Sequence, residues 1–334
     1  MIGAAEDVLW PGKPPRSEVG LLAPRSAEVW DAKEIAVPNQ IQDATNNDLN
    51  RATVDYMAEV FDLYLALQHA NIPVEFVDED GLSPQGLKSY RVLYVTEPNI
   101  PAEGQQGLVD WVRAGGTLVT VSGAGQRDRY DEPCAVLSQA TGIQEGRRSR
   151  LLIEDARTLK DMGKGAGKLG SFQAVGVRSV AAAPAENAAA TFDDGTPAAI
   201  ARVVGSGRAV HFAWMPGLSY WKSSGGTKDG LPVGFSESLR NWISWPVGLA
   251  QVSLPVKVNH PLVETPVLAS PAGIGITLLN WNGESLPDVQ VEVRTDRNVT
   301  GVESVRHGKL QFQSTSDQTR FALPLGGADI VTLR

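Results

Sequence analysis

The chain has 334 residues, a length that favours about two domains, each large enough to bury a hydrophobic core. Its formal net charge of -8 argues against a nucleic-acid platform, because binding the phosphate backbone needs a basic face. The single cysteine, Cys134, excludes an intrachain disulfide framework and any multi-cysteine metal site, and no other feature of the sequence predicts a cofactor or metal.

The first 17 residues are predicted to form a linker or an extended segment, because WPGKPPRSE is typical of a connector. The opening MIGAAEDVLW has neither the basic segment nor the apolar segment of a signal peptide, so no signal peptide is predicted. No apolar run approaches the roughly 20 residues of a membrane span, so a membrane partner is not expected. The compartment is left open.

The next elements predict a strand and a helix. The apolar run Glu18 to Ala23 is typical of a buried strand, and Asn47 to Asn71 is predicted to be a helix that Asn46 or Asn47 caps and that ends before Pro73. Apolar residues at helical spacing predict its buried face: Met57, Val60, Phe61, Tyr64 and Leu65.

Three further strands alternate with a helix. The strands are predicted at Pro73 to Asp78, Arg91 to Glu97 and Thr117 to Ser122. Between the last two, Pro101 suits the first turn of a helix and Gly115-Gly116 ends it. Apolar strands that alternate with helices indicate a parallel sheet covered on both faces, so the fold class is α/β.

The rest of the first domain is less regular. Residues 147–173 are basic and glycine-rich, and we interpret them as an insertion, either a solvated loop or an anion-binding loop. Gly205-Ser206-Gly207 predicts a hairpin whose second strand ends at Trp214 and closes the sheet. A last helix is predicted at Glu237 to Trp245, which gives an α/β domain over residues 18–246.

A second, all-β domain is predicted for residues 256–334, after a junction at 246–255. Short segments of alternating apolar and polar residues, such as VQVEVR and DIVTLR, follow one another at regular spacing, and Asn282-Gly283 is a turn signal. These features indicate a small antiparallel β-sandwich.

Ligands of an open parallel sheet bind at the carboxyl ends of its strands. This rule selects four loops: Pro24 to Asp31, Glu97 to Asn99, Ser122 to Tyr130 and Pro216 to Trp221. Ser122 precedes two glycines and does not lie between them, so the segment does not match a nucleophile elbow. Ser122, Glu97 and Asp128 are weak catalytic candidates, and the contiguous Asp78, Glu79 and Asp80 are interpreted as a solvated turn.

A nucleophile also needs a base, and none of the four histidines is placed at the strand ends. His69, His211, His260 and His307 are interpreted as packed or surface histidines. Cys134 is expected on a helix as a buried, inert thiol.

Three aromatic residues are candidates for sugar binding. Trp30, Tyr220 and Trp221 are predicted to lie near the same rim, where exposed rings could stack on a sugar. The alternative is a hydrophobic patch that docks another domain or subunit.

Three segments carry a family resemblance: EVGLLAPRSAEVWD, YLALQHANIPVEFVDEDGL and YRVLYVTEPNIPAEGQQGLVDWVRAGGTLVTVSGAG. Together they resemble the middle, or trimerisation, domain of family 42 β-galactosidases over about residues 18–142. Asp194 to Tyr220 is similar to the closing part of that domain, and GIGITLLNWNG to the small C-terminal β domain. The resemblance implies a flavodoxin-like, class I glutamine amidotransferase-like fold.

The resemblance also implies what to expect of function. In the family the catalytic glutamates lie on a (β/α)₈ barrel of about 250 residues, for which this chain has no room beside its two domains. The amidotransferase cysteine is replaced by Ser122-Gly123, and Ala213 to Pro216 stands where its histidine and glutamate would follow the last strand.

We therefore expect a non-catalytic accessory module that supports assembly of a homo-oligomer or a partner glycosidase domain. Two alternatives stay open. One is a hydrolase, acting on a sugar or an amide, with a site at the strand ends. The other is a stand-alone carbohydrate-binding protein.

Overall fold

A computed structural model describes residues 2–23, 25–35, 53–151, 157–161, 172–174, 176–228 and 231–334. Pro24, the expected caps Asn46 and Asn47, and most of the basic, glycine-rich stretch lie outside the described residues. Two separate hydrophobic cores hold these residues together. One spans Val19 to Val247 and the other spans Val256 to Leu333.

Within the described residues, a nine-stranded sheet forms the centre of the first part, in the order β2-β1-β3-β4-β11-β10-β9-β6-β7. Its strands are β1 (Val19–Leu22), β2 (Glu75–Val77), β3 (Val92–Val95), β4 (Thr117–Val121), β6 (Arg157–Asp161), β7 (Gln173–Ala174), β9 (Ala188–Phe192), β10 (Pro197–Val204) and β11 (Gly207–Phe212). From β2 to β11 neighbouring strands run parallel, and from β11 onward they run antiparallel. The predicted parallel sheet is thereby confirmed.

The predicted hairpin joins β10 to β11, but it does not close the sheet. Strand β11 pairs with β4 on its other side, so it lies inside the sheet, and β9, β6 and β7 continue beyond β10. The expected insertion is also partly regular. Strand β5 (Gln144–Leu151) pairs with β8 (Gly176–Ala182), and β6 joins the main sheet.

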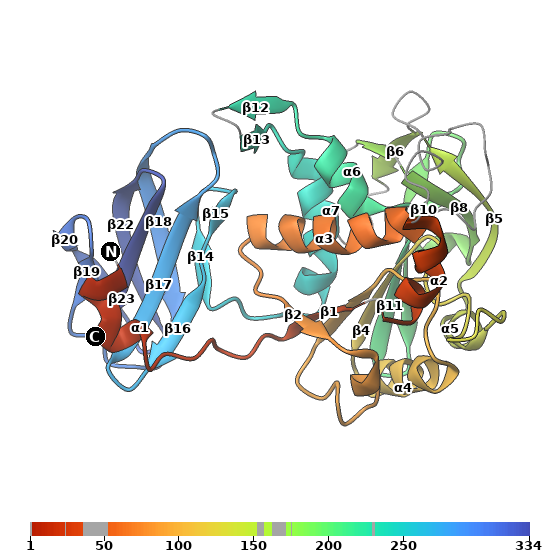
Figure 1. The fold of residues 1–334 in the computed structure, drawn as a ribbon, viewed down its shortest axis with the longest axis horizontal. Helices are drawn as coiled ribbons and strands as arrows, with labels where there is room; N and C mark the ends of the chain where they lie inside the picture. Colours follow the sequence, from red (N-terminus) through yellow and green to blue (C-terminus); the bar gives the residue numbers. More distant parts are fainter. Residues whose placement is uncertain are drawn as a thin grey trace.

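Helices cover both faces of the sheet (Figure 1). On one side pack α2 (Arg25–Ile35), α3 (Thr53–His69), α6 (Pro216–Lys222) and α7 (Glu237–Leu249), and on the other α4 (Ala102–Arg113) and α5 (Val136–Thr141). Two of the four loops predicted at the strand ends are therefore helices. Pro216 stands at the first turn of α6, where a backbone N–H would have no partner within the helix, so its missing N–H costs nothing. The short strands β12 (Gly226–Lys228) and β13 (Leu231–Val233) follow α6.

The buried face predicted for α3 is wrong. Val60 is buried as expected, but Phe61 is 60% exposed and Tyr64 is 37% exposed. The helix instead buries the stripe of Tyr56, Glu59, Val60, Leu63, Ala66 and Leu67. Both stripes have helical spacing, because α3 is apolar on more than one side. Which side is buried depends on the elements that pack against α3, namely α6, α7 and the sheet. The periodicity of the sequence does not specify these partners.

The last helix of the first core, α7, extends beyond its predicted end at Trp245. Its start is capped by Ser236, whose Oγ accepts a hydrogen bond from the backbone N–H of Leu239 at 3.3 Å. Pro246 lies inside the helix, and the chain stays helical to Leu249. Val247 packs into the first core, so burial holds the last turn in place.

The C-terminal part is an antiparallel β-sandwich, as predicted. One sheet has the order β14-β18-β22-β21, and the other has β15-β17-β23-β19-β20 with β16 also paired to β17. The strands are β14 (Val256–Val258), β15 (Val263–Glu264), β16 (Val267–Ser270), β17 (Gly273–Asn280), β18 (Leu286–Arg294), β19 (Val302–Ser304), β20 (Gly308–Lys309), β21 (Phe312–Ser314), β22 (Gln318–Leu325) and β23 (Ala328–Leu333). Alternate residues of β18 and β22 are buried, which is the period of a sheet with one solvated face.

The N-terminal segment differs from the predicted linker. The short helix α1 (Glu6–Leu9) packs on β16 and β17 of the sandwich, and the preceding 3₁₀ helix, η1 (Ile2–Ala5), packs on β23. Val8 is fully buried, and Asp7 forms an ion pair with Arg334 at the other end of the chain. Both termini therefore lie on the sandwich, while an extended stretch after Trp10 leads to β1 (Figure 1).

Candidate functional site

The carboxyl ends of β1, β3, β4 and β11 stand next to one another in the sheet, and we call this border the strand-end edge. Two of the segments that leave it are loops. Thr96 to Pro101 follows β3, and Ser122 to Ala135 follows β4. Helix α2 follows β1, and α6 follows β11 after a three-residue connection. The site candidates of the sequence are distributed over these four segments.

The turn after β4 is the place where a nucleophile elbow would present its side chain. Gly123 occupies the turn with φ +87°, and its N–H donates to Oε2 of Glu145 at 2.8 Å. A Cβ at this residue would collide with the hydroxyl of Tyr56 and lie 2.7 Å from Nη1 of Arg148. The turn therefore has the backbone of an elbow, but Tyr56 and Arg148 fill the space that a nucleophile would need.

Ser122, the residue before this turn, is fully buried, and its Oγ has no hydrogen-bond partner. Its hydroxyl thus lies beneath the turn, away from solvent. Without a base within hydrogen-bond reach, a serine hydroxyl stays protonated and is a weak nucleophile. The structure gives Ser122 no catalytic geometry.

Glu97 lies beside it at the end of β3. The last printed pair of the two strands joins Val95 to Thr120, and the same register places Glu97 alongside Ser122. Oε2 of Glu97 accepts hydrogen bonds from the N–H and the hydroxyl of Thr96, whereas Oε1 has no partner. Burial raises the pKa of Glu97 to about 8, so the carboxyl group is protonated at neutral pH.

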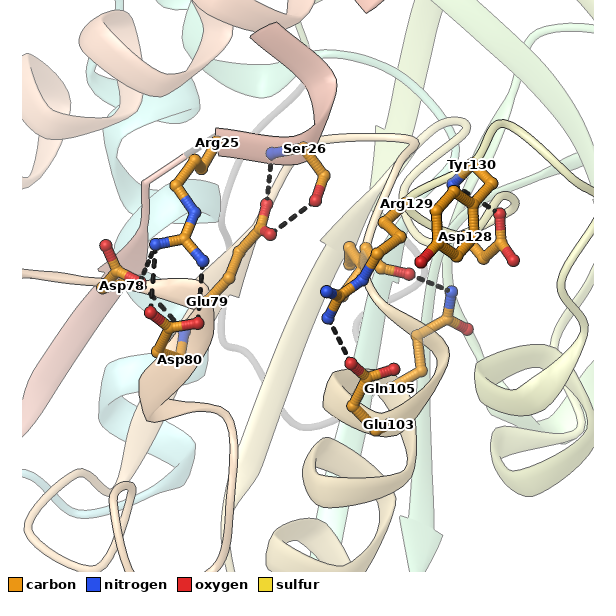
Figure 2. A network of polar contacts seen from close by, with 11 residues as sticks. Arg25, Ser26, Asp78, Glu79, Asp80, Glu103, Gln105, Asp128, Arg129 and Tyr130 are labelled. Carbon is orange, nitrogen blue, oxygen red and sulfur yellow. Dashed lines mark hydrogen bonds and ion pairs between the residues drawn. The ribbon is translucent and has the colours of Figure 1, made fainter. Parts of the chain in front are cut away.

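Asp128 has a structural part in the loop after β4. Its Oδ1 accepts a hydrogen bond from the backbone N–H of Tyr130 at 2.8 Å (Figure 2) and another from that of Glu132 at 3.0 Å. Asn99 and Gln105 donate to backbone carbonyls of the same loop, at Asp128 and at Arg127. The loop is therefore held by hydrogen bonds from both sides, and the Asp128 carboxylate is part of that network.

The acidic run after β2 is not a solvated turn throughout. Glu79 is 5% exposed, and its carboxylate accepts two hydrogen bonds of 2.6 Å from the N–H and the hydroxyl of Ser26 (Figure 2). Asp78 and Asp80 are exposed and pair with Arg25. Since Ser26 lies in the first turn of α2, the acidic run stabilises the start of this helix.

The three aromatic candidates do not form one rim. Trp30 lies on α2, and its indole N–H donates to the carbonyl of Arg129 at 3.0 Å. Tyr220 is fully buried. Its hydroxyl lies 2.9 Å from Nδ1 of His69, and its ring stacks on Phe235. It is therefore not available to a sugar ring. Trp221, the next residue of α6, is 39% exposed.

His211, Glu145 and Arg148 were missed or set aside by the sequence reasoning. His211 is buried on β11, with Nδ1 3.0 Å from Oγ1 of Thr120 and Nε2 3.9 Å from Oε1 of Glu145. Burial lowers the pKa of this histidine, although the nearby Glu145 acts in the opposite direction. Arg148 lies in the segment 147–173 that was interpreted as an insertion, and Glu145 lies just before it, so no periodicity indicated that both belong to β5.

Cys134 corrects a further expectation. It precedes α5, is half-buried, and lines a small cavity with His211. Within the described residues, no group of three or more His, Cys, Asp or Glu side chains is arranged to hold a metal ion. In the same part of the chain, no helix is both long and apolar enough to cross a membrane.

Similarity to known structures extends over nearly the whole chain. The β-galactosidase from Rahnella sp. R3 superposes with a TM-score of 0.66 at 16% identity, covering 97% of this chain and 42% of that enzyme. The β-galactosidase from Bacillus circulans sp. alkalophilus gives 0.65 at 16% identity, with 95% and 41% covered. An α-L-fucosidase from Paenibacillus thiaminolyticus gives 0.59 at 13% identity, with 100% and 50% covered.

The chain thus spans about two fifths of the length of these β-galactosidases, and at such identities the likeness concerns the fold. A sequence comparison with curated proteins gives no significant match. The sequence profile of the β-galactosidase trimerisation domain matches residues 29–222, which is more than half of the chain. The protein therefore belongs to the β-galactosidase trimerisation domain family.

Proposed function

We propose that this chain is a non-catalytic assembly module that associates with copies of itself, as a trimer, and so supports a glycosidase. The name of the matched family is the first support, since the match covers α3, β2 and the carboxyl ends of β3, β4 and β11. The blocked turn at Gly123 and the burial of Ser122 and Glu97 are the second. They argue against the hydrolase alternative, which requires these groups to reach a substrate.

An apolar surface inside the matched region is the observation that carries the proposal. Phe61 and Tyr64 on α3 are 60% and 37% exposed, and Phe76 on β2 is 49% exposed. The rings of Tyr64 and Phe76 stack, with centroids 5.5 Å apart. We call Phe61, Tyr64 and Phe76 the α3–β2 patch.

Two physical properties suit this patch to self-association. Aromatic side chains bury large areas at low entropic cost, and they are enriched in the buried centres of interfaces. In addition, β2 is the terminal strand of the nine-stranded sheet among the described residues, so the patch surrounds an edge with unpaired backbone groups. A second copy that covers the patch would protect both the aromatic rings and the edge.

Light scattering across a dilution series tests the proposal. The wild-type chain is expected to give the mass of a trimer at high concentration and to dissociate on dilution. The double variant Phe61→Ser/Phe76→Ser should shift this dissociation to concentrations at least about 30-fold higher, since each buried aromatic contributes on the order of 1–3 kcal/mol.

Tyr130→Ser is the matched control, because Tyr130 is 71% exposed but lies on the loop after β4, away from α3 and β2. This variant should keep the wild-type mass at every concentration. A wild-type chain that stays monomeric at all concentrations would overturn the assembly proposal. If an oligomer forms and both variants leave it intact, the interface lies outside the α3–β2 patch.

Carbohydrate binding is a second candidate function, which the 39% exposure of Trp221 favours. Its ring centroid lies 6.2 Å from that of Phe235, with the two ring planes inclined by 48°. Quenching of tryptophan fluorescence by galacto-oligosaccharides, lost in Trp221→Ala but kept in Trp10→Ala, would support it. Trp10 is 85% exposed on the N-terminal segment and serves as the exposed control.

A further inference from the structure

A cavity of about 240 Å³ lies between α5 and the strands β4 and β11, all of which contribute residues to its lining. Thr120 of β4 and His211 of β11 form its floor, and α5 contributes Leu137 and Ser138 to its wall. The exposed lining residues are Pro133, Ala135 and Gln144, so the cavity meets solvent beside the start of α5. It is distinct from the α3–β2 patch, which lies on the other side of the sheet.

A buried ring nitrogen without a partner and a buried carboxylate lie side by side at this cavity. The side chain of His211 is 3% exposed, and its Nε2 has no hydrogen-bond partner. The side chain of Glu145 is 6% exposed, and its Oε2 accepts from the N–H of Gly123. Its Oε1 is 3.9 Å from the Nε2 of His211, too far for a direct hydrogen bond. A buried polar atom left unpaired costs about 1–3 kcal/mol.

The neighbour of His211 decides which ring nitrogen carries the proton. The hydroxyl of Thr120 lies 3.0 Å from Nδ1 of His211 and 3.5 Å from the carbonyl of Val210. The carboxylate of Glu145 lies 3.9 Å from Nε2 and favours a proton on that nitrogen, so Nδ1 is unprotonated and accepts from the hydroxyl of Thr120. In the neutral imidazole that burial favours, the proton then resides on Nε2, on the side of the ring that faces Glu145.

The cavity floor therefore presents a donor, the Nε2–H of His211, next to an acceptor, Oε1 of Glu145. A single oxygen placed about 2.8 Å from both atoms would see them at an angle of about 90°, which suits a hydroxyl that accepts from one and donates to the other. An ammonium group has no lone pair for the histidine N–H, and a carboxylate would be repelled by Glu145.

We propose that this cavity binds a small neutral polyol, of monosaccharide size or smaller, through one hydroxyl held between His211 and Glu145. The volume fits this class, since it corresponds to about eight water molecules at roughly 30 Å³ each. The wall adds further polar partners at Gln126, Ser138 and Thr141 among apolar side chains. Alternating polar and apolar lining is what a sugar, with hydroxyl groups on an apolar ring, requires.

The single cysteine of the chain supplies a built-in reporter for this site. Cys134 lines the cavity and is half-buried, so its alkylation by iodoacetamide reports on occupancy. D-galactose and glycerol should slow the alkylation in a saturable manner. Methylammonium and acetate should leave it unchanged. Titration calorimetry with D-galactose on the same protein gives a second measurement that does not depend on the reactivity of the thiol.

Glu145→Gln tests the floor of the cavity, because the amide can still accept from Gly123 while its NH₂ group faces the histidine N–H. The affinity for D-galactose should fall about tenfold, the value of one hydrogen bond to a charged group. Glu292→Gln, a surface substitution on the sandwich, should leave it unchanged.

The proposal would be overturned if neither measurement detected binding of D-galactose or glycerol, or if methylammonium protected the thiol instead. Equal binding by wild type and Glu145→Gln would also overturn it. The result does not depend on the proposed assembly, since a monomeric chain contains the whole cavity.

Discussion

The hydroxyl of Tyr56 occupies the space into which a side chain at Gly123 would project. Tyr56 comes from α3 and is buried, and Gly123 forms the turn after β4 with φ +87°. The contact therefore joins the helix layer to the strand-end edge at the point where related architectures present a nucleophile. It requires glycine for two reasons, the positive φ angle and the close approach of Tyr56.

Replacing Gly123 by serine is expected to destabilise the chain and to create no hydrolase. The added Oγ would need both a strained φ angle and displacement of Tyr56, so the free energy of unfolding should fall by about 2–4 kcal/mol. Urea denaturation measures this change, and chromogenic esters and glycosides measure turnover.

Gly195→Ala is the matched control for the strain alone, because Gly195 has φ +83° and nothing lies within 4 Å of a Cβ there. It should cost about 1 kcal/mol. If Gly123→Ser were no more destabilising than Gly195→Ala, the packing of Tyr56 against the turn would not matter. Ester turnover by Gly123→Ser would show that the elbow is open.

Glu97 should make the protein less stable as the pH rises. Burial raises its pKa from 4.5 to about 8, so between these values the folded chain holds a proton that the unfolded chain has lost. The contribution of this group to stability is fully present below pH 4.5 and is lost by about pH 8, a change of roughly 4 kcal/mol.

Glu97→Gln stays neutral and should remove this dependence, which urea denaturation at pH 5 and pH 8 can measure. The variant should gain stability over wild type mainly at pH 8. Glu103→Gln, whose side chain is 71% exposed, should follow the wild-type dependence. An equal effect of Glu97→Gln at both pH values would show that Glu97 is ionised in the folded chain.

His69 should have the opposite effect at acid pH. Burial, helped by the charge of Arg240, lowers its pKa from 6.5 to about 4, so the unfolded chain binds a proton before the folded chain does. The free energy of unfolding should therefore decrease by about 3 kcal/mol as the pH falls from 6.5 to 4. Proton NMR of the imidazole can follow the titration directly. A His69 resonance that titrates near 6.5 in the folded protein would contradict the assignment.

The N-terminal helix should stabilise the β-sandwich to which it binds. Val8 of α1 is fully buried, and Leu9 approaches Gly275 of β17 so closely that a Cβ there would lie 2.6 Å from its Cδ2. Val8→Asp should cost about 3 kcal/mol or detach the helix, which urea denaturation and limited proteolysis after Trp10 would detect. Ile2→Asp, at a side chain that is 71% exposed, should change little. If Val8→Asp changed neither the free energy of unfolding nor the rate of proteolysis, the N-terminal helix would not stabilise the sandwich.

Local sequence signals predicted most of the elements correctly because each signal acts over a few residues. The apolar runs that end at Leu22, Val95 and Val121 are strands of a parallel sheet, and the glycines at 205 and 207 form a hairpin. The signals did not place β11 inside the sheet, because strand order depends on pairing between distant segments. For the same reason they missed that β6 extends the sheet from within an irregular stretch.

The candidate site shows the same division. The sequence indicated that Ser122-Gly123 does not match a nucleophile elbow, since the order of serine and glycine is a local property. It did not indicate that Tyr220 is buried against His69, or that Phe61 and Tyr64 are exposed, because each depends on which neighbours pack against a helix. The burial of Glu97 and His211, and hence their pKa shifts, depends on tertiary packing in the same way.

The sequence by itself determined the α/β class, the β-sandwich and the resemblance to the trimerisation domain, because periodicity, turn residues and motifs are written along the chain. Only the tertiary structure decided that residues from α3, β5 and β11 surround the turn after β4, that Tyr56 closes it, and that a donor and an acceptor meet at the floor of a cavity. These relationships join residues that are far apart in the chain, such as Tyr56 and Arg148, which are 92 positions apart, and contacts of that kind are set by the packing of the whole domain.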